Sequence, residues 1–272
     1  MEIEIAFSPC PNDTFIFDAM VNGKIDTGGI RFKPVLMDVQ ALNECAIEER
    51  YPITKISYGA YPAVSENYVI LDSGSALGSG VGPLLISSEK INELNPEETI
   101  VAIPGETTTA HVLFNAAFPN WKNKIFLRYD LIEDFVKAHK GIGVIIHENR
   151  FTYAERGLNK ISDLGEVWER NKSMPIPLGG IVASRKLNHS FSKKIESLIS
   201  ESIKYAQKNN DKLPDFVKSN AQEMSEDVMR KHIDLYVNEY SISLSEHGRN
   251  AIEVFLQHCK TEWKNNKQNI FL

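Results

Sequence analysis

Charged and apolar residues alternate over residues 2–7, which is typical of a β-strand with one buried face. Prolines then end this strand, and a helix is predicted at residues 12–21. A second strand is expected at residues 30–36, and a second helix at 39–49 with Asp38 as its N-cap. This alternation of strands and helices predicts an α/β fold with a parallel or mixed sheet covered by helices.

The alternation continues through the middle of the chain. Apolar runs that end at glycine, proline or polar residues predict further strands, and amphipathic stretches between them predict helices. The expected strands lie at residues 53–57, 68–71, 82–87, 99–103, 124–129, 141–146 and 176–184. The expected helices lie at residues 108–117 and 131–139.

Beyond residue 185 the pattern changes to helices alone. Amphipathic helices are predicted at residues 191–209, 225–240 and 245–259, each with an apolar face that packs on a core. In the first of them this face carries Ile195, Leu198, Ile199, Ser202, Ile203 and Ala206. The polar residues 260–272 are expected to dock only loosely.

The strand–helix pattern starts twice, which predicts two lobes in a chain of this length. We expect the first lobe to comprise residues 1–90 and 185–272, and the second to comprise residues 91–184. The chain then crosses twice between the lobes, and a small ligand binds in the cleft between them. We interpret the glycines at residues 78–82 as a hinge, because they lack the spacing of a dinucleotide-binding motif.

The composition narrows the classes of function. The net charge of the 272 residues is −6, and no run of basic residues suggests a face that binds nucleic acid. The three cysteines are widely spaced without a CxxC pair, as expected for reduced thiols in the cytoplasm. The N-terminus lacks the pattern of a secretory signal, and no apolar run reaches the roughly 18–20 residues of a membrane span. We therefore expect a cytoplasmic protein that acts on a small molecule, and the oligomeric state stays open.

The first candidate for chemistry lies where the first strand meets the first helix, in residues 8–15. Ligands of open α/β sheets bind at the carboxyl ends of strands, and helix N-termini present free N–H groups to anions. Asn12, Asp13 and Thr14 are therefore candidates for ligand contact. The alternative is that they only cap the helix.

A second candidate is Lys55, in the strand expected at residues 53–57. The alternation of side chains along a strand places Lys55 and Ser57 on the same face, with Ile56 between them. A cation beside a hydroxyl group suits a carboxylate or polyol ligand. The alternative is a solvent-exposed lysine on an edge strand.

A third candidate is the sequence GETTTAH at residues 105–111, which follows a strand and opens a helix. Hydroxyl groups beside the unpaired N–H groups of a helix N-terminus form a ready anion site. The residues concerned are Thr107, Thr108, Thr109 and Ala110. The sequence is not a Walker loop, because the GK[ST] motif is missing.

The fourth candidate is His147, which follows an unbroken run of apolar and glycine residues at 141–146. This position is the carboxyl end of a buried strand, where a histidine can act as a general base near neutral pH. The alternative is that His147 satisfies local backbone groups. Five other histidines fall in or beside helices that we expect to be exposed, namely His139, His189, His232, His247 and His258.

The sequence lacks three common signatures of catalytic sites. It has no HExxH motif, no pair of carboxylates at the spacing of metal ligands, and no GxSxG elbow. We therefore expect a mechanism that needs neither a metal nor a cofactor.

Six motifs follow one another along the chain. They are SPCPNDTF at residues 8–15, ITKISYGAYP at 53–62, GSGVGPLLIS at 78–87, PGETTTAHVL at 104–113, GVIIHENRFTY at 143–153 and PLGGIVASRKL at 177–187. Together they resemble the 1,4-dihydroxy-6-naphthoate synthases, enzymes of the futalosine pathway of menaquinone biosynthesis. The resemblance extends in order and spacing to about residue 190, and the helical C-terminal part is compatible with it.

The resemblance implies a two-lobe fold like that of the type II periplasmic binding proteins. It implies a lyase that converts cyclic dehypoxanthinyl futalosine into 1,4-dihydroxy-6-naphthoate by proton abstraction and carbon–carbon bond cleavage, with release of a small sugar-derived fragment. It also implies that His147 is the proton acceptor. The implied substrate contacts are Lys55, Ile56, Ser57, Thr109 and Ala110, with Asn12, Thr107 and Thr108 as further candidates.

Three other functions remain open at this point. A solute-binding protein shares the expected fold, although the missing secretory signal argues against it. A chorismate dehydratase of the same pathway also shares the fold, but the motifs at residues 8–15 and 146–148 favour the synthase. An effector-sensing domain of a regulator is a more distant alternative, because no basic pair of DNA-binding helices is evident.

Overall fold

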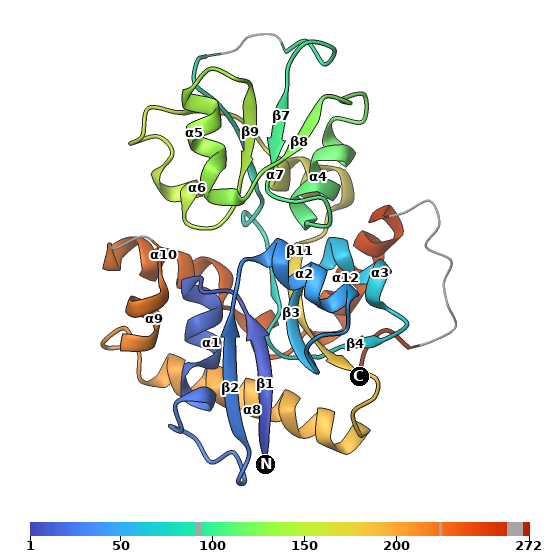
Figure 1. Ribbon diagram of the computed structural model, residues 1–272, viewed down its shortest axis with the longest axis vertical. Coiled ribbons are helices and arrows are strands. Elements are labelled where there is room, and N and C mark those ends of the chain that lie inside the picture. The colour runs from blue at the N-terminus through green and yellow to red at the C-terminus, as the bar shows by residue number, and fades with distance from the viewer. Residues whose placement is uncertain (91–93, 223–224, 260–268) are drawn as a thin grey trace.

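The computed structural model describes residues 1–90, 94–222, 225–259 and 269–272. These residues form two lobes, one above the other in Figure 1, and each lobe is built around one β-sheet. The strands of the first sheet are β1 (Glu2–Phe7), β2 (Arg31–Leu36), β3 (Ile53–Ser57), β4 (Tyr68–Ile70), β5 (Ala76–Gly78) and β11 (Ile176–Ser184). The strands of the second sheet are β6 (Leu84–Ser87), β7 (Val101–Ile103), β8 (Lys124–Phe126), β9 (Ile142–Ile145) and β10 (Asn159–Asp163).

Helices surround both sheets. Those of the first lobe are α1 (Pro11–Val21), α2 (Val39–Ile47), the short 3₁₀ helix η1 (Tyr58–Ala60), α3 (Tyr61–Val64), α8 (His189–Lys208), α9 (Asp215–Asn220), α10 (Glu226–Tyr236), α11 (Glu239–Ile242) and α12 (Ser245–Cys259). Those of the second lobe are α4 (Thr109–Ala117), the 3₁₀ helix η2 (Tyr129–Leu131), α5 (Ile132–Lys137), α6 (Asn149–Thr152) and α7 (Leu164–Lys172).

Both sheets are mixed, as the strand–helix pattern predicted. The order in the first sheet is β2-β1-β3-β11-β4, with β5 also paired to β11. β1 runs parallel to β2 and β3, whereas β11 is antiparallel to its neighbours. The order in the second sheet is β10-β6-β9-β7-β8, in which β7 is parallel to β8 and β9. The carboxyl ends of β3 and β9 both lead to the region between the lobes (Figure 1).

The chain changes sheets at other positions than expected. β6 lies in the second sheet, although the expected boundary at residue 90 places it in the first lobe. β11 lies in the first sheet, although the expected boundary at residue 184 places it in the second lobe. The crossings therefore fall between β5 and β6 and between α7 and β11. The hydrophobic pattern reveals that a strand is buried, but its sheet is decided by its pairing, here with β9 and β10 for β6.

Several short elements carry no clear signal in the sequence. β10 has the polar sequence NKISD and pairs with β6 through an irregular register, and α7 follows it directly. Its alternation is too brief to distinguish it from a loop. The longer elements match the expected ones closely, because long periodic patterns are distinctive. In α8, the buried residues include the whole predicted apolar stripe, from Ile195 to Ala206.

The apolar core is divided among three clusters. One lies in the first lobe between α1, α8 and the sheet, one lies in the second lobe around β6 and β9, and one extends across both lobes. Within the part of the chain that the structure describes, every helix is too short or too polar to span a lipid bilayer.

The last four residues lie beside the first sheet. The backbone N–H of Leu272 donates a hydrogen bond to the carbonyl oxygen of Ile70. The backbone N–H of Ile70 donates one to the carbonyl oxygen of Ile270. Phe271 is buried. The loose docking expected for the tail is therefore wrong for residues 269–272, while residues 260–268 lie outside the described part.

Candidate active site

A cavity lies between the two lobes and encloses about 720 Å³, counting the part open to solvent. From the first lobe it is lined by Asn12 of α1 and by Lys55, Ile56 and Ser57 at the end of β3. From the second lobe it is lined by Thr108, Thr109 and Ala110 at the start of α4, and by His147 after β9. The structure thus brings together eight of the nine predicted site residues.

Thr107 is the predicted residue that does not line this cavity. Its hydroxyl group donates a hydrogen bond to Gln40 of α2 at 3.0 Å, and its carbonyl oxygen and hydroxyl group both accept from Asn43 of the same helix. Thr107 therefore ties the loop before α4 to the first lobe.

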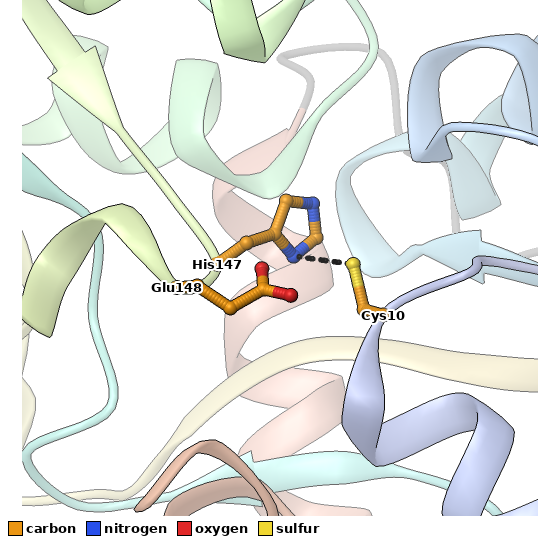
Figure 2. Close-up of side chains that lie close together, drawn as sticks. All are labelled: Cys10, His147 and Glu148. Atoms are coloured by element: carbon orange, nitrogen blue, oxygen red, sulfur yellow. Dashed lines mark hydrogen bonds between the residues drawn. The ribbon is translucent and has the colours of Figure 1, made fainter. Parts of the chain in front are cut away.

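His147 is held in an unusual backbone conformation at the end of β9. Its φ angle is +60°, in the left-handed region that non-glycine residues rarely adopt. Figure 2 shows the ring directed toward Cys10, with Nδ1 3.4 Å from Sγ and the other ring nitrogen pointing away from the thiol. The Tyr129 ring packs against the imidazole edge-on, with ring centres 5.0 Å apart. The imidazole is thereby fixed on two sides, while Nε2 stays available to a ligand.

Burial controls the charge of His147. Loss of hydration lowers its pKa from an ordinary value of 6.5 to about 4, whereas the carboxylates of Asp13 and Asp38 act in the opposite direction with smaller effect. The pKa of the neighbouring Cys10 thiol is raised well above its usual value, mainly by burial and next by Glu148. At neutral pH the pair is therefore an uncharged imidazole beside a protonated thiol.

Lys55 forms a buried ion pair with Asp13. The distance between Nζ and Oδ1 is 2.9 Å, and 7% and 2% of the two side chains are exposed. β3 lies between β1 and β11, so the alternative of an exposed lysine on an edge strand is wrong. Lys55 lines the cavity with its charge already balanced.

Asp13 is itself held by the residues around it. Its Oδ2 accepts hydrogen bonds from the backbone and hydroxyl groups of Ser8, and its Oδ1 accepts one from the Asn12 amide. Helix α1 has Cys10 as its N-cap without any side-chain cap, and Pro11 stands at its first position. Asn12 and Asp13 therefore face the cavity, and the alternative that they only cap the helix is wrong.

The N-terminus of α4 reaches across to the first lobe. Thr108 is its N-cap and accepts a hydrogen bond from His111 N–H. The Thr109 hydroxyl group donates to the carbonyl oxygen of Leu178 at 2.6 Å and accepts from Gly59 N–H at 3.1 Å. The first N–H groups of a helix have no partner within the helix, so those of Thr109 and Ala110 can bind an anionic oxygen in the cavity.

Several cavity residues were not predicted from the sequence, among them the polar residues Arg150, His232 and Tyr236. Arg150 bonds to the carbonyl oxygen of Gly82 and to Asp163. His232, expected on an exposed helix, has only 1% of its surface exposed, so that expectation is wrong. The spacing of His232 and Tyr236 in the amphipathic pattern of α10 was the available signal, since they share its buried face with Met229 and Ile233.

Comparison with known proteins identifies the family to which this chain belongs. A family model described as menaquinone biosynthesis matches residues 3–261. The chain belongs to this menaquinone biosynthesis family. Two relatives named 1,4-dihydroxy-6-naphthoate synthase agree with the assignment. The one from Thermus thermophilus is 40% identical over 251 residues, covering 92% of this chain and 91% of the relative. The one from Streptomyces coelicolor is 35% identical over 266 residues, covering 96% and 93%.

Solved structures confirm the fold of this menaquinone biosynthesis family member. Protein AF1704 from Archaeoglobus fulgidus is 29% identical and superimposes with a TM-score of 0.89, covering 94% of this chain and 96% of that one. The CA3427 gene product of Candida albicans, described as having the generic periplasmic binding protein fold, is 13% identical with a TM-score of 0.68, covering 98% and 92%. The family and the two-lobe fold predicted from the motifs are therefore both confirmed.

Three residues beside the cavity are of the types that bind metal ions. Cys10, His147 and Glu148 each bring one ligand atom to within 4.8 Å of the others (Figure 2). Thiolate, imidazole and carboxylate are the donors that zinc uses in proteins. Without a metal, burial and next Glu148 hold the pKa of the Cys10 thiol well above its usual value, so the sulfur keeps its proton. The same arrangement also suits a buried thiol that orients a catalytic histidine.

Proposed function

We propose that this protein is a 1,4-dihydroxy-6-naphthoate synthase that converts cyclic dehypoxanthinyl futalosine by proton abstraction and carbon–carbon bond cleavage. One observation carries the proposal. The neutral imidazole of His147 lines the same cavity as the predicted contacts at the end of β3 and at the start of α4. An uncharged histidine has a free nitrogen with which to accept a proton at neutral pH. The names of the two curated relatives support the same activity.

His147 Nε2 is the proposed proton acceptor. In the tautomer that leaves this nitrogen free, Nδ1–H donates a weak hydrogen bond to Cys10 Sγ, whose distance of 3.4 Å allows it. The proton to be removed lies next to a carbonyl group, so the electron pair moves toward that oxygen. Cleavage of the carbon–carbon bond follows, and formation of the aromatic ring drives it forward.

The N-terminus of α4 is the proposed binding site for an anionic oxygen of the substrate. The N–H groups of Thr109 and Ala110 are fixed before the reaction, and groups of this kind stabilise charge that develops in a transition state. Thr109 accepts a hydrogen bond from Gly59 of the first lobe, which supports the proposal that the site is complete only when the lobes are together. Closure then excludes water from the reacting atoms.

Lys55, Ile56 and Ser57 are proposed to contact the substrate from the opposite side. Ser57 N–H is already bound to the Asn43 side chain at 2.8 Å, so the hydroxyl group of Ser57 is the part that remains for a ligand. Lys55 donates to Asp13 at 2.9 Å and to the carbonyl oxygen of Gly74 at 3.4 Å, and its third N–H group is proposed to bind a substrate oxygen. No metal or cofactor is needed for these steps.

The test is turnover by His147→Gln and the wild type, followed by the absorbance of the naphthoate product. Loss of a general base lowers kcat by roughly 10²–10⁴-fold. His139→Gln is the matched control, because this exposed histidine contacts Ser88 rather than the cavity. Near-wild-type product formation by His147→Gln would remove His147 from the mechanism.

Two other activities give different outcomes in the same assay. A solute-binding protein would bind the cyclic futalosine compound without forming product. A chorismate dehydratase would convert chorismate and leave the futalosine compound unchanged. Either result with the wild type overturns the proposed function.

The cytoplasm is the proposed location. Cys10 and Cys45 are buried free thiols, which are typical of proteins in a reducing compartment. Fractionation of cells that produce the protein, with the activity followed in each fraction, tests the location.

A further inference from the structure

His232 is a buried histidine whose two ring nitrogens both lack a hydrogen-bond partner among the described residues. It lies on α10, where only 1% of its surface is exposed. Buried polar atoms in proteins are nearly always bonded, so an unsatisfied one needs an explanation. The neighbouring helix residues Met229 and Ile233 are packed in an apolar cluster, and an apolar side chain at position 232 would fill the same space without this cost.

The position of His232 supplies the explanation. The side chain lines the cavity between the lobes, as does His147. The two imidazole rings are 6.5 Å apart between centres and are tilted by 35°. Tyr236 packs on His232, with ring centres 4.6 Å apart, and the ring centre of Phe151 lies 6.5 Å from that of His232. The ring is thus packed among aromatic neighbours at the wall of the cavity, with both nitrogens buried and without a partner among the described residues.

The chemistry of the ring limits what it can bind. Burial, with further effects of His147 and Lys55, keeps the pKa of His232 well below its usual range. The ring is therefore uncharged and offers one N–H donor and one nitrogen acceptor. A neutral imidazole can polarise a carbonyl group by donating a hydrogen bond without giving up its proton. A ligand that brings a carbonyl or hydroxyl oxygen into the cavity would satisfy this donor.

We propose that His232 is a second catalytic histidine, which donates a hydrogen bond to the substrate oxygen that becomes negative when His147 removes the proton. The inference rests on the proposed function. In the step concerned, a C–H bond breaks, its proton goes to His147 Nε2, and its electron pair forms an enolate whose oxygen accepts the N–H of His232. No electrons enter or leave, and His232 keeps its proton throughout.

The arrangement also links catalysis to the relative position of the lobes. His147 follows β9 of the second lobe, whereas His232 belongs to α10 of the first lobe. The base and the hydrogen-bond donor therefore face the same substrate only when the lobes are together. The second histidine thus deepens the role of closure in the proposed mechanism.

The experiment compares His232→Phe, His232→Gln and the wild type, with His258→Phe as the matched control. His258 lies on α12, bonds to the backbone of its own helix and does not line the cavity. We expect His232→Phe to keep or raise the thermal midpoint, because two unsatisfied polar atoms are removed. We expect its kcat to fall by about 10²–10³-fold, the usual effect of losing one donor to a developing oxyanion. His232→Gln, which retains an N–H donor, is expected to recover part of kcat.

The outcomes separate this inference from the proposed function. A wild type that forms no naphthoate product overturns the proposed function, and this inference with it. With an active wild type, kcat for His232→Phe within about twofold of the wild type overturns the inference alone. If His232→Gln is as slow as His232→Phe, the donor role is wrong.

Discussion

His147 and Cys10 form an uncharged pair whose state is set by burial. The carboxylates of Asp13 and Asp38 favour the protonated imidazole, but the loss of hydration has the larger effect on its pKa. The residue is therefore ready to accept a proton at neutral pH. Its φ angle of +60° directs the ring out of the strand, and the cost of this conformation is one that proteins accept at functional sites.

The pH dependence of activity follows from this pKa. We expect kcat/KM to be flat between about pH 6 and 8 and to fall with a midpoint near 4, because only the neutral imidazole can take the proton. Initial rates at substrate concentrations well below KM measure kcat/KM at each pH and therefore this fall at acid pH. An inflection near pH 6.5 would contradict the lowered pKa of His147.

Stability changes in the same pH range and must be measured in parallel. The folded pKa of His147 lies below its unfolded value, so the unfolded chain binds more protons between about pH 6.5 and 4. This contribution to stability is full above pH 6.5 and declines as the pH falls through that window. The pKa of His232 is also lowered in the folded protein, so His232 likewise makes the protein less stable as the pH falls. Thermal midpoints at each pH therefore distinguish loss of fold from protonation of the base.

Replacement of Lys55 is expected to change both binding and stability. Lys55→Met removes a proposed substrate contact, so KM should rise, and it leaves Asp13 buried without its cation. Breaking a buried pair in this way costs about 3–5 kcal/mol. Denaturant unfolding measures the second effect, and steady-state kinetics measures the first.

The double variant Lys55→Met with Asp13→Asn is the control for this prediction. Removing the lone charge should restore much of the stability but not KM. An unchanged KM in both variants would remove Lys55 from the substrate site, and equal stability of the single and double variants would contradict the ion-pair argument.

At the scale of elements, the contact between η1 and the start of α4 joins the two lobes beside the cavity. Gly59 makes the close approach possible, because a Cβ atom there would lie 2.8 Å from the Thr108 carbonyl oxygen and 3.0 Å from Thr109 N. Both neighbours are backbone atoms, so they cannot move aside alone. The helix N-terminus is thus positioned by a glycine on the opposite lobe.

Gly59→Ala is expected to push α4 away from η1. A displacement of about 1 Å at a catalytic group can lower activity by about 10²-fold, and we expect a loss of this size in kcat/KM. Gly23→Ala serves as the control, because this glycine has a φ of +67° and open space around it, so its cost should appear in stability alone. Equal kinetics for Gly59→Ala and the wild type would contradict the role of this contact.

At the scale of the whole molecule, the site is assembled from two lobes that are each built on a separate sheet. A ligand that contacts both lobes binds only the folded, assembled protein and therefore stabilises it. At a concentration 100 times its Kd, such a ligand contributes about 2.7 kcal/mol. The position of the cavity thus makes thermal stability a readout of binding.

Saturating 1,4-dihydroxy-6-naphthoate is expected to raise Tm by about 5 °C, which is the shift that this free energy produces in a chain of this size. Differential scanning fluorimetry over a series of concentrations measures the shift. An unrelated aromatic acid such as benzoate is the control. A Tm that does not depend on the naphthoate concentration would argue against a product site in this cavity.

The sequence by itself determined the long elements, the family and eight of the residues that line the cavity. Apolar periodicity located α8 with its buried stripe, and an apolar run ending at a histidine located His147. These signals are local, because the residues that form one strand or one helix face lie close together in the sequence. The motifs of residues 8–15, 53–62 and 104–113 were recognisable for the same reason.

Only the tertiary structure decided which groups meet. The pairing of Lys55 with Asp13, the contact of Cys10 with His147, and the arrival of His232 at the cavity join residues 42 to 137 positions apart or on different lobes. Sheet membership of β6 and β11 likewise depends on partners distant in the chain. Hydrophobic pattern reports whether a side chain is buried, whereas the charge and the role of a buried group depend on the neighbours that folding brings to it.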